Sequence, residues 1–402
     1  MNIFKKAYCR TFQTAFKIAI PFLPYRTPKV TGSVKTIPDI LEKKGKRRVL
    51  IVTDAEIRKL GLTKELEKLL TQRHIFYTIY DKTAANPTTA NVAQAADQYR
   101  RNACNVLIGF GGGSSMDCAK AVGACIANPN KSPAQMKGIL RVRKKLPLLI
   151  AIPTTAGTGS ETTLATVITD SVTRHKYAIN DFPLIPRYAV LDPRITLSLP
   201  PALTATTGMD ALTHAVEAYI GNSTTYGTRK NARMAVKLIF ENLYTVYENG
   251  ANIRARRNML HASYYAGCAF TKSYVGYVHA VAHSLGGAYN VPHGLANAVL
   301  LPLVLEAYGP RIHKKLHRLA VEVGLADRQD SPAVGARRFI EAIEDMKQRF
   351  SIGTSIPQLQ KADIPHLARL ADKEANPLYP VPVLKDAKEL EEFYRLILPK
   401  EE

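Results

Sequence analysis

The pattern of apolar positions along the chain changes once, near residue 199. Before that point, short apolar runs rich in β-branched residues alternate with amphipathic stretches. The runs predict strands at 47–54, 74–81, 105–113 and at the start of 147–161, and the stretches between them predict helices at 57–73, 88–103 and 114–127. Strands that alternate with helices predict a parallel sheet with helices on its faces.

After residue 199 the apolar residues recur at helical spacing, as in DALTHAVEAY (210–219) and the stretch 232–250. Strand signals are few from there to the end, so the second half is expected to be helical. These changes divide the chain into three parts, 1–30, 31–199 and 200–402.

The first part has a helical stripe of its own. Its aromatic and apolar residues stand four apart, at Phe4, Tyr8, Phe12, Phe16 and Ile20. Lys17 and Pro21 interrupt the run, which is therefore too short to span a bilayer. A basic amphipathic helix can lie on a membrane. We expect instead that this helical extension packs on the body of the protein or on another subunit.

Charge changes the picture little. The 402 residues carry 55 Lys and Arg against 33 Asp and Glu, a formal net charge of +22. The basic runs at 43–48, 141–145 and 254–257 are short and belong to no recognisable nucleic-acid module. We expect no nucleic-acid partner, and interpret the charge as a solvated surface that attracts an anionic cofactor. Five cysteines without a CxxC pair favour reduced thiols and a cytoplasmic location.

Glycines in GFGGGSSMD (109–117) lie where a predicted strand runs into a helix. Such a loop lets the backbone approach a phosphate, and the helix start offers unpaired N–H groups; a plain tight turn is the alternative. The motif departs from the usual dinucleotide fingerprint, because Ser114 stands where a third glycine is expected. The acidic residue that follows a strand is Asp54, upstream of the loop.

Histidines mark a second candidate site. Asp210 and His214 are four apart, as are His279 and His283, so each pair shares a helix face. His293 follows in a predicted turn before another helix. Each histidine alone could be a polar helix residue. One carboxylate with several imidazoles and no thiolate favours a divalent ion such as Fe²⁺ or Zn²⁺.

Together these motifs resemble the iron-dependent (group III, iron-containing) alcohol dehydrogenase family. The similar stretches are GFGGGSSMDCAK, PTTAGTGSE, LDP, TGMDALTHAVEAY, HAVAHSLGGAYNVPHGLANAVLLP and, in the tail, ADKEANPLYP. The resemblance implies an α/β N-terminal Rossmann-like dinucleotide-binding domain (31–199) and an all-α C-terminal metal-binding and substrate domain (200–402), the dehydroquinate synthase-like fold. It says little about the extension at 1–30.

The resemblance also implies roles for single residues. The metal ligands would be Asp210, His214, His279 and His293, and His283 would lie near the substrate without binding the metal. The cofactor would contact Asp54, Asn86, Gly112, Gly113, Ser114, Asp117, Thr154, Thr155, Thr158, Val167 and Lys176. Phe270 and Ala165 would line the substrate pocket, where alanine suggests simple alcohols over diols.

The implied activity is reversible hydride transfer between a primary alcohol and its aldehyde, with Fe²⁺ (or Zn²⁺) polarising the oxygen. A carboxylate at Asp54 accepts hydrogen bonds from a ribose and repels a 2′-phosphate, so NAD(H) is expected in preference to NADP(H). The imidazole of His283 is the natural proton relay, with a purely orienting role as the alternative.

Rival functions remain open at this stage. A zinc polyol (glycerol-type) dehydrogenase and a dehydroquinate-synthase-like lyase share the fold class. A basic protein that binds membrane or nucleic-acid surfaces is the alternative from a different class. The partners we expect are a small alcohol or aldehyde and further copies of the chain in a homodimer or higher homo-oligomer, without membrane association.

Overall fold

The structure is a computed structural model that describes residues 1–173 and 175–399. Contacts divide it into two compact units. The sheet unit comprises Pro24–Leu199 with Gly250–Gly267, and the helical unit comprises Met1–Leu23, Pro200–Asn249 and Cys268–Glu402. The extension at the start of the chain is therefore grouped with the helical unit.

The sheet unit is built on six parallel strands in the order β1-β9-β6-β4-β2-β3. The strands are β1 (Lys29–Thr31), β2 (Arg48–Val52), β3 (Phe76–Tyr80), β4 (Val106–Gly111), β6 (Leu148–Pro153) and β9 (Tyr188–Val190). Four of them, β2, β3, β4 and β6, lie in the stretches predicted as strands. The predicted α/β class of this part is confirmed.

The register explains why these strands are apolar at successive positions. Leu50 pairs with Leu107, which pairs with Leu149, and the next residues Ile51, Ile108 and Ile150 pair in the same way. Neighbouring residues of a strand point to opposite faces. The leucine row lies in one buried cluster and the isoleucine row in another. Both faces of the sheet are covered, as parallel sheets require.

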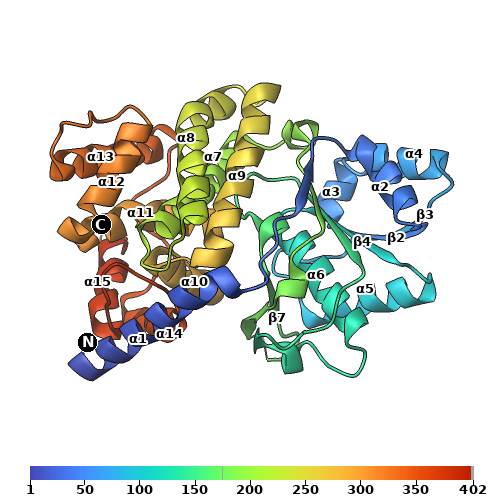
Figure 1. The fold of residues 1–402 in the computed structure, drawn as a ribbon, viewed down its shortest axis with the longest axis horizontal. Helices are drawn as coiled ribbons and strands as arrows, with labels where there is room; N and C mark the ends of the chain where they lie inside the picture. The colour runs from blue at the N-terminus through green and yellow to red at the C-terminus, as the bar shows by residue number, and fades with distance from the viewer. Residues whose placement is uncertain (174, 400–402) are drawn as a thin grey trace. The chain divides into compact units, whose positions relative to one another are not determined.

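The helices of the sheet unit differ from the prediction at two places, since the helix at 37–43 was not predicted and the stretch 57–73 was expected as one helix. They are α2 (Ile37–Lys43), α3 (Ala55–Lys59), α4 (Lys64–Gln72), α5 (Thr89–Arg101) and α6 (Gly113–Ala127) (Figure 1). The stretch 57–73, expected as one helix, is two, because Gly61 adopts φ of +69° and breaks the helical turn between them. A glycine tolerates this left-handed conformation.

A second, three-stranded sheet was not foreseen from the sequence. Its strands are β5 (Gly138–Ile139), β7 (Ala165–Thr169) and β8 (Lys176–Asn180), in the order β5-β8-β7. Ile168 and Ile179 from this sheet enter the same buried cluster as Leu50 and Leu107. The small sheet therefore joins the core on one side of the large one.

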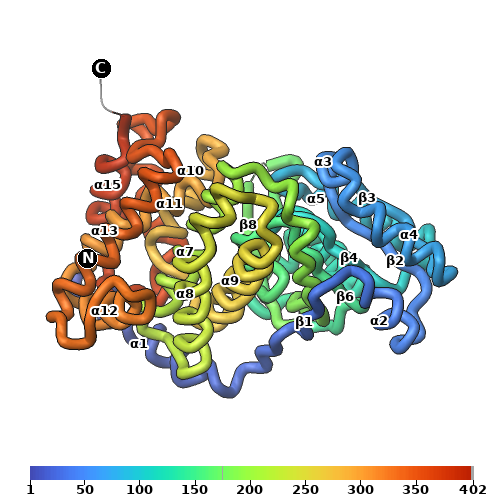
Figure 2. The backbone as a smooth tube through the Cα atoms, turned by 90° about the horizontal axis from the view of Figure 1, so that it is seen from above, coloured from blue at the N-terminus to red at the C-terminus, as the bar shows by residue number. Residues whose placement is uncertain are grey.

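In the helical unit, as far as the structure describes it, the chain forms helices without strands. They are α1 (Ile3–Ala19), α7 (Pro201–Ile220), α8 (Tyr226–Glu248), α10 (Tyr277–Tyr289), α11 (His293–Tyr308), α12 (His313–Glu322), α13 (Pro332–Arg349), α14 (Ile364–Ala375) and α15 (Ala387–Leu396) (Figure 2). Helix α9 (Ile253–Ser273) contributes residues to both units. Helix α7 is buried on all sides from Gly208 to Ile220, which makes it the central helix of this unit.

The predicted N-terminal helix is α1, and it packs on the helical unit (Figure 1). Lys5 pairs with Asp372 of α14 at 2.8 Å, and Arg10 donates to the carbonyl of Val381 at 2.7 Å. Its opposite face keeps Phe4 83% exposed. Among the described residues, no helix is long and apolar enough to cross a membrane.

Candidate functional site

The four predicted metal ligands meet in the helical unit. Helix α7 presents Asp210 and His214 one turn apart, α10 presents His279, and α11 begins at His293. One ligand atom from each lies within 4.8 Å of the others. Three of the side chains are buried and His293 is partly exposed. Three separate helices therefore converge on one small volume.

The arrangement around this volume is asymmetric. Oδ1 of Asp210 lies 3.5 Å from Nε2 of His293 and 3.9 Å from Nε2 of His279. The ring of His214 stacks on Phe270, with centroids 4.1 Å apart and planes 12° from parallel. Phe270, predicted to line the substrate pocket, thus lies beside the candidate metal centre and gives it an apolar wall.

The chemistry of the donor set fits a divalent transition metal. Burial, together with the neighbouring His214, His293 and His283, holds the pKa of His279 well below its ordinary value. The ring is therefore neutral, which is the state that ligates a metal. A carboxylate and neutral imidazoles are the ligands of Fe²⁺ and Zn²⁺ sites. In this cluster the acceptor atoms of the four side chains face one another, so a bound cation would be coordinated by all of them.

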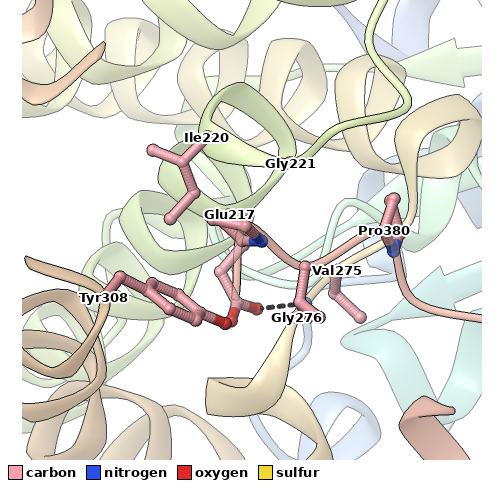
Figure 3. A pocket seen from close by; sticks show the side chains of 9 residues that line it. Glu217, Ile220, Gly221, Val275, Gly276, Tyr308 and Pro380 are labelled. Carbon is pink, nitrogen blue, oxygen red and sulfur yellow. Dashed lines mark hydrogen bonds between the residues drawn. The ribbon is translucent and has the colours of Figure 1, made fainter. Parts of the chain in front are cut away.

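Glu217 is a residue of this site that the sequence analysis missed. Its carboxylate lies 2.6 Å from Nδ1 of His279 and accepts hydrogen bonds from the N–H groups of Gly276 (2.8 Å) and Val278 (2.9 Å). Figure 3 shows the bond to Gly276. Burial raises the pKa of Glu217 to about 7. The signal was available, because Glu217 stands one turn beyond His214 on the same face of α7.

Asn297 is the second residue that was missed. Its Nδ2 lies 2.7 Å from Oδ1 of Asp210, and 3.2 and 3.1 Å from Nε2 of His279 and His293. The amide therefore touches three of the four candidate ligands. Its place four residues after His293, one turn along α11, was the available signal.

His283 points to a different partner from His279. Its Nδ1 lies 2.6 Å from Oε1 of Glu374, and its ring stacks on that of His293 with centroids 5.0 Å apart. It is not part of the group of four whose ligand atoms converge. Burial raises the pKa of Glu374, but the charge and hydrogen bond of His283 outweigh it and leave that pKa lowered.

In the sheet unit, the predicted phosphate loop lies between β4 and α6. Gly111 has φ of +152°, and a Cβ there would lie 2.5 Å from Oγ of Ser115, so the turn requires glycine. No side chain caps the start of α6 at Gly112. A Cβ on Gly113 would lie 3.1 Å from Thr158. The glycine loop therefore lies against the second loop, PTTAGTGSE (153–161), which contains Thr158. The start of α6 offers unpaired N–H groups to an anion.

Asp54 lies beside this loop. It follows β2, caps α3 by accepting from the N–H of Ile57 at 3.0 Å, and accepts from the hydroxyl of Ser115 at 3.1 Å. The carboxylate predicted to meet a ribose thus reaches the loop predicted to meet the phosphates. Asp117, in contrast, already accepts from Ser160 at 2.6 Å and from the N–H of Val167 at 2.9 Å. Its carboxylate ties the two loops together.

The other predicted cofactor residues fall into small groups. Nζ of Lys176 donates to Oδ1 of Asn86 at 2.9 Å, and Ser114 donates to the carbonyl of Ala85. The N–H of Thr154 donates to Gly111 at 3.0 Å. A Cβ on Gly112 would lie 3.8 Å from Thr155.

The second predicted pocket residue, Ala165, begins β7 in the sheet unit. Its carbonyl accepts from the buried Lys120 at 2.8 Å. A substrate role for this residue stays a prediction.

Comparison with known proteins identifies relatives along most of the chain. The family model "Iron-containing alcohol dehydrogenase" matches residues 27–193, and "Fe-containing alcohol dehydrogenase family, C-terminal" matches 204–397. The chain is 38% identical over 330 residues to alcohol dehydrogenase 4 of Saccharomyces cerevisiae, covering 82% of this chain and 85% of that one. It is 36% identical over 352 residues to NAD-dependent methanol dehydrogenase of Bacillus methanolicus, covering 87% and 92%.

A solved structure of 1,3-propanediol oxidoreductase matches with a TM-score of 0.88 and 34% identity, covering 92% of this chain and 98% of that one. These relatives are alcohol oxidoreductases, so they confirm that class of activity. They do not favour a lyase, a glycerol-type dehydrogenase or a surface-binding protein.

Proposed function

Because the chain belongs to the iron-containing alcohol dehydrogenase family, we propose that it oxidises a small primary alcohol reversibly to its aldehyde, with NAD(H) as cofactor and Fe²⁺ at the metal centre. The proposed ligands are Asp210, His214, His279 and His293. The observation that carries this proposal is the convergence of their four ligand atoms within 4.8 Å. Zn²⁺ suits the same ligands, so metal occupancy follows supply as well as affinity.

When bound, the metal polarises the substrate oxygen and the nicotinamide exchanges a hydride with the substrate carbon. The protein's own residues do the rest. Glu217 accepts from Nδ1 of His279 and so directs Nε2 of that ring towards the metal site. Phe270, stacked on His214, excludes water from one side of the centre.

Oxidation of an alcohol releases the hydroxyl proton as well as the hydride, and a residue must carry that proton away. His283 is the residue we propose for this step. Its Nδ1 faces Glu374, so Nε2 is the atom that takes the proton from the substrate and gives it back in reduction. The stacking of its ring on that of His293, a proposed metal ligand, supports this role.

The sheet unit is proposed to bind the dinucleotide. The backbone at Gly112, Gly113 and Ser114 supports a pyrophosphate-binding role, since it lies at the uncapped start of α6. The position of Asp54 beside this loop supports a preference for NAD(H) over NADP(H). The name of the methanol dehydrogenase relative, which states NAD dependence, agrees with this proposal.

The proposed substrate class follows from the two pocket residues. Phe270 and Ala165 are apolar, which favours simple alcohols over diols. The relatives include a methanol dehydrogenase as well as a 1,3-propanediol dehydrogenase. A homo-oligomeric state and a cytoplasmic location stay predictions, to be checked by light scattering and by cell fractionation.

The first experiment is anaerobic reconstitution of the metal-free protein with Fe²⁺ or Zn²⁺. NADH oxidation is then followed against aldehydes of increasing length and polarity. We expect activity with at least one short aldehyde, dependent on the added metal. Equal activity in the presence of a strong chelator would contradict the proposed metal centre.

Two variants separate the roles of the paired histidines on α10. His279→Ala is expected to lose bound metal, because it removes a ligand. His283→Ala is expected to keep the metal content of the parent protein while turnover falls by roughly 10²- to 10⁴-fold, the usual contribution of general acid–base catalysis. Loss of metal from His283→Ala would show that the assignment of the two residues is wrong.

A further inference from the structure

Helix α14 supplies a carboxylate, Glu374, which is the hydrogen-bond partner of His283. We propose that Glu374 is a positioning residue that acts through His283, holding the imidazole in its Nδ1–H tautomer so that Nε2 exchanges the substrate proton. This inference rests on the proposed role of His283.

The contact between the two side chains fixes the tautomer. Nδ1 of His283 lies 2.6 Å from Oε1 of Glu374. An ionised carboxylate only accepts hydrogen bonds, so the hydrogen must be on Nδ1. In a neutral ring the lone pair is then on Nε2. A base that takes a proton from a substrate needs that lone pair on a defined atom.

Glu374 is itself held by a buried side chain. The hydroxyl of Tyr379 donates to the same Oε1 at 2.7 Å, and Tyr379 is only 7% exposed. The backbone of Tyr379 is held in turn by Gln13 of α1, whose Nε2 donates to its carbonyl at 2.7 Å. These hydrogen bonds restrict the rotation of the Glu374 side chain.

An ion pair between partly exposed groups forms without a further hydrogen bond such as the one from Tyr379 to Glu374. The side chains of His283 and Glu374 are 39% and 36% exposed, and pairs of that kind contribute little to stability. Here one oxygen accepts from both an imidazole and a buried phenol. This arrangement fixes geometry, and geometry is what a proton-transferring ring requires.

His279, the neighbouring histidine, has the same kind of hydrogen bond from Nδ1 to a carboxylate, although its proposed role is to bind the metal. His279 donates from Nδ1 to Glu217 in a buried pair, and its Nε2 faces Asp210 at 3.9 Å. His283, one turn further along α10, donates from Nδ1 to Glu374. Each histidine of the pair thus has its own carboxylate at Nδ1.

The tautomer can be measured directly. The protein is labelled with ¹⁵N-histidine, loaded with diamagnetic Zn²⁺ and examined at pH 8 by two-bond ¹H–¹⁵N correlation, with His283→Gln assigning the signal. We expect the Nδ1–H form for His283 in the parent protein. Glu374→Leu should shift the signal towards the Nε2–H form, whereas Glu374→Gln, which keeps an accepting oxygen, should retain the Nδ1–H form.

Kinetics on the same variants give a second readout. Glu374→Leu should lower kcat by roughly tenfold to a hundredfold, as for other residues that orient a functional histidine, with KM changed less than kcat and metal content unchanged. Glu374→Gln should restore most of the lost turnover. Glu392→Leu removes an exposed glutamate of α15 and serves as the control, with parent values for both measurements.

The outcomes separate this inference from the function it rests on. If His283→Gln keeps full turnover, the proposed role of His283 fails and this inference fails with it. If His283→Gln loses turnover but Glu374→Leu keeps the Nδ1–H form and the parent kcat, only the role of Glu374 is overturned. Should Glu374→Leu not fold, Glu374→Thr is put through the same two measurements.

Discussion

Oε2 of Glu217 lies 2.6 Å from Nδ1 of His279, and both side chains are almost fully buried. The glutamate comes from α7 and the histidine from α10, so the pair links two of the helices that carry candidate ligands. A buried carboxylate behind a ligating imidazole fixes the ring and increases its basicity.

We therefore predict that Glu217→Gln weakens metal binding by roughly tenfold to a hundredfold. The amide lacks the charge that polarises the imidazole ring. It also has only one accepting oxygen, whereas both carboxylate oxygens of Glu217 accept hydrogen bonds. Competition with a chelator, followed by metal analysis, measures the effect. Glu306→Gln, which alters an exposed glutamate of α11, should bind metal like the parent. Equal affinity of the two variants would remove Glu217 from the metal centre.

Asp54 is predicted to set the choice of dinucleotide. Asp54→Asn keeps an oxygen that can cap α3 but removes the charge that opposes a 2′-phosphate. The ratio of kcat/KM for NADH to that for NADPH should fall by roughly tenfold, which corresponds to about 1.4 kcal/mol. A parent enzyme that already prefers NADPH would contradict the assignment.

Lys120 is predicted to make stability depend on pH in the sheet unit. Its Nζ is fully buried and donates to Ser160, Thr163 and the carbonyl of Ala165. Burial lowers the pKa of Lys120 from 10.5 to about 8, against the opposing effect of Asp117 and Glu161. Between these two values the unfolded chain holds a proton that the folded protein has released. Stability therefore rises with pH across that window, relative to a chain without this lysine.

Urea unfolding of the parent and of Lys120→Met between pH 8 and 10.5 tests this sign. The difference in unfolding free energy should move in favour of the parent by roughly 3 kcal/mol across the window. Lys144→Met, at an exposed position, controls for the loss of one positive charge and should follow the parent. A constant difference between parent and Lys120→Met would mean that Lys120 keeps an ordinary pKa.

Helix α1 is predicted to stabilise the helical unit through Arg10. The guanidinium donates to the carbonyls of Val381 and Pro382 at 2.7 and 2.9 Å. Arg10→Ala leaves both carbonyls without these donors, which should cost roughly 1–3 kcal/mol. Lys6→Ala, at an exposed position of the same helix, should change stability by less than about 0.5 kcal/mol. Similar melting temperatures for both variants would show that the docking of α1 does not depend on Arg10.

The sequence predicted the central strands of the large sheet because β2, β4 and β6 are buried on both faces. The continuous apolar runs at β2, β4 and β6 have no helical period, and glycine or polar residues end them. The three-stranded sheet was missed because its strands are short and alternate weakly, so tertiary packing of Ile168 and Ile179 decides their conformation. The break at Gly61 was missed because a single glycine is tolerated within a helical pattern.

In the candidate site, too, sequence spacing predicted some of the neighbours, and only the folded structure reveals the others. Spacing placed Asp210 with His214, and His279 with His283, on common helix faces. Spacing treats the two histidines of α10 alike, whereas the structure separates them by their carboxylates, Glu217 and Glu374. The second of these comes from a segment about 90 residues further along the chain, and no local pattern connects it to α10.

The docking of α1 also has a consequence for synthesis. Its partners Asp372, Tyr379 and Val381 lie 366 to 371 residues downstream of the residues they bind. At ribosomal rates of about 5–20 residues per second, roughly 20 to 70 seconds separate the two. During that interval the residues of α1 that are buried in the folded protein, Cys9 and Gln13, have no surface to pack on. We therefore expect α1 to dock only after the C-terminal segment has been synthesised.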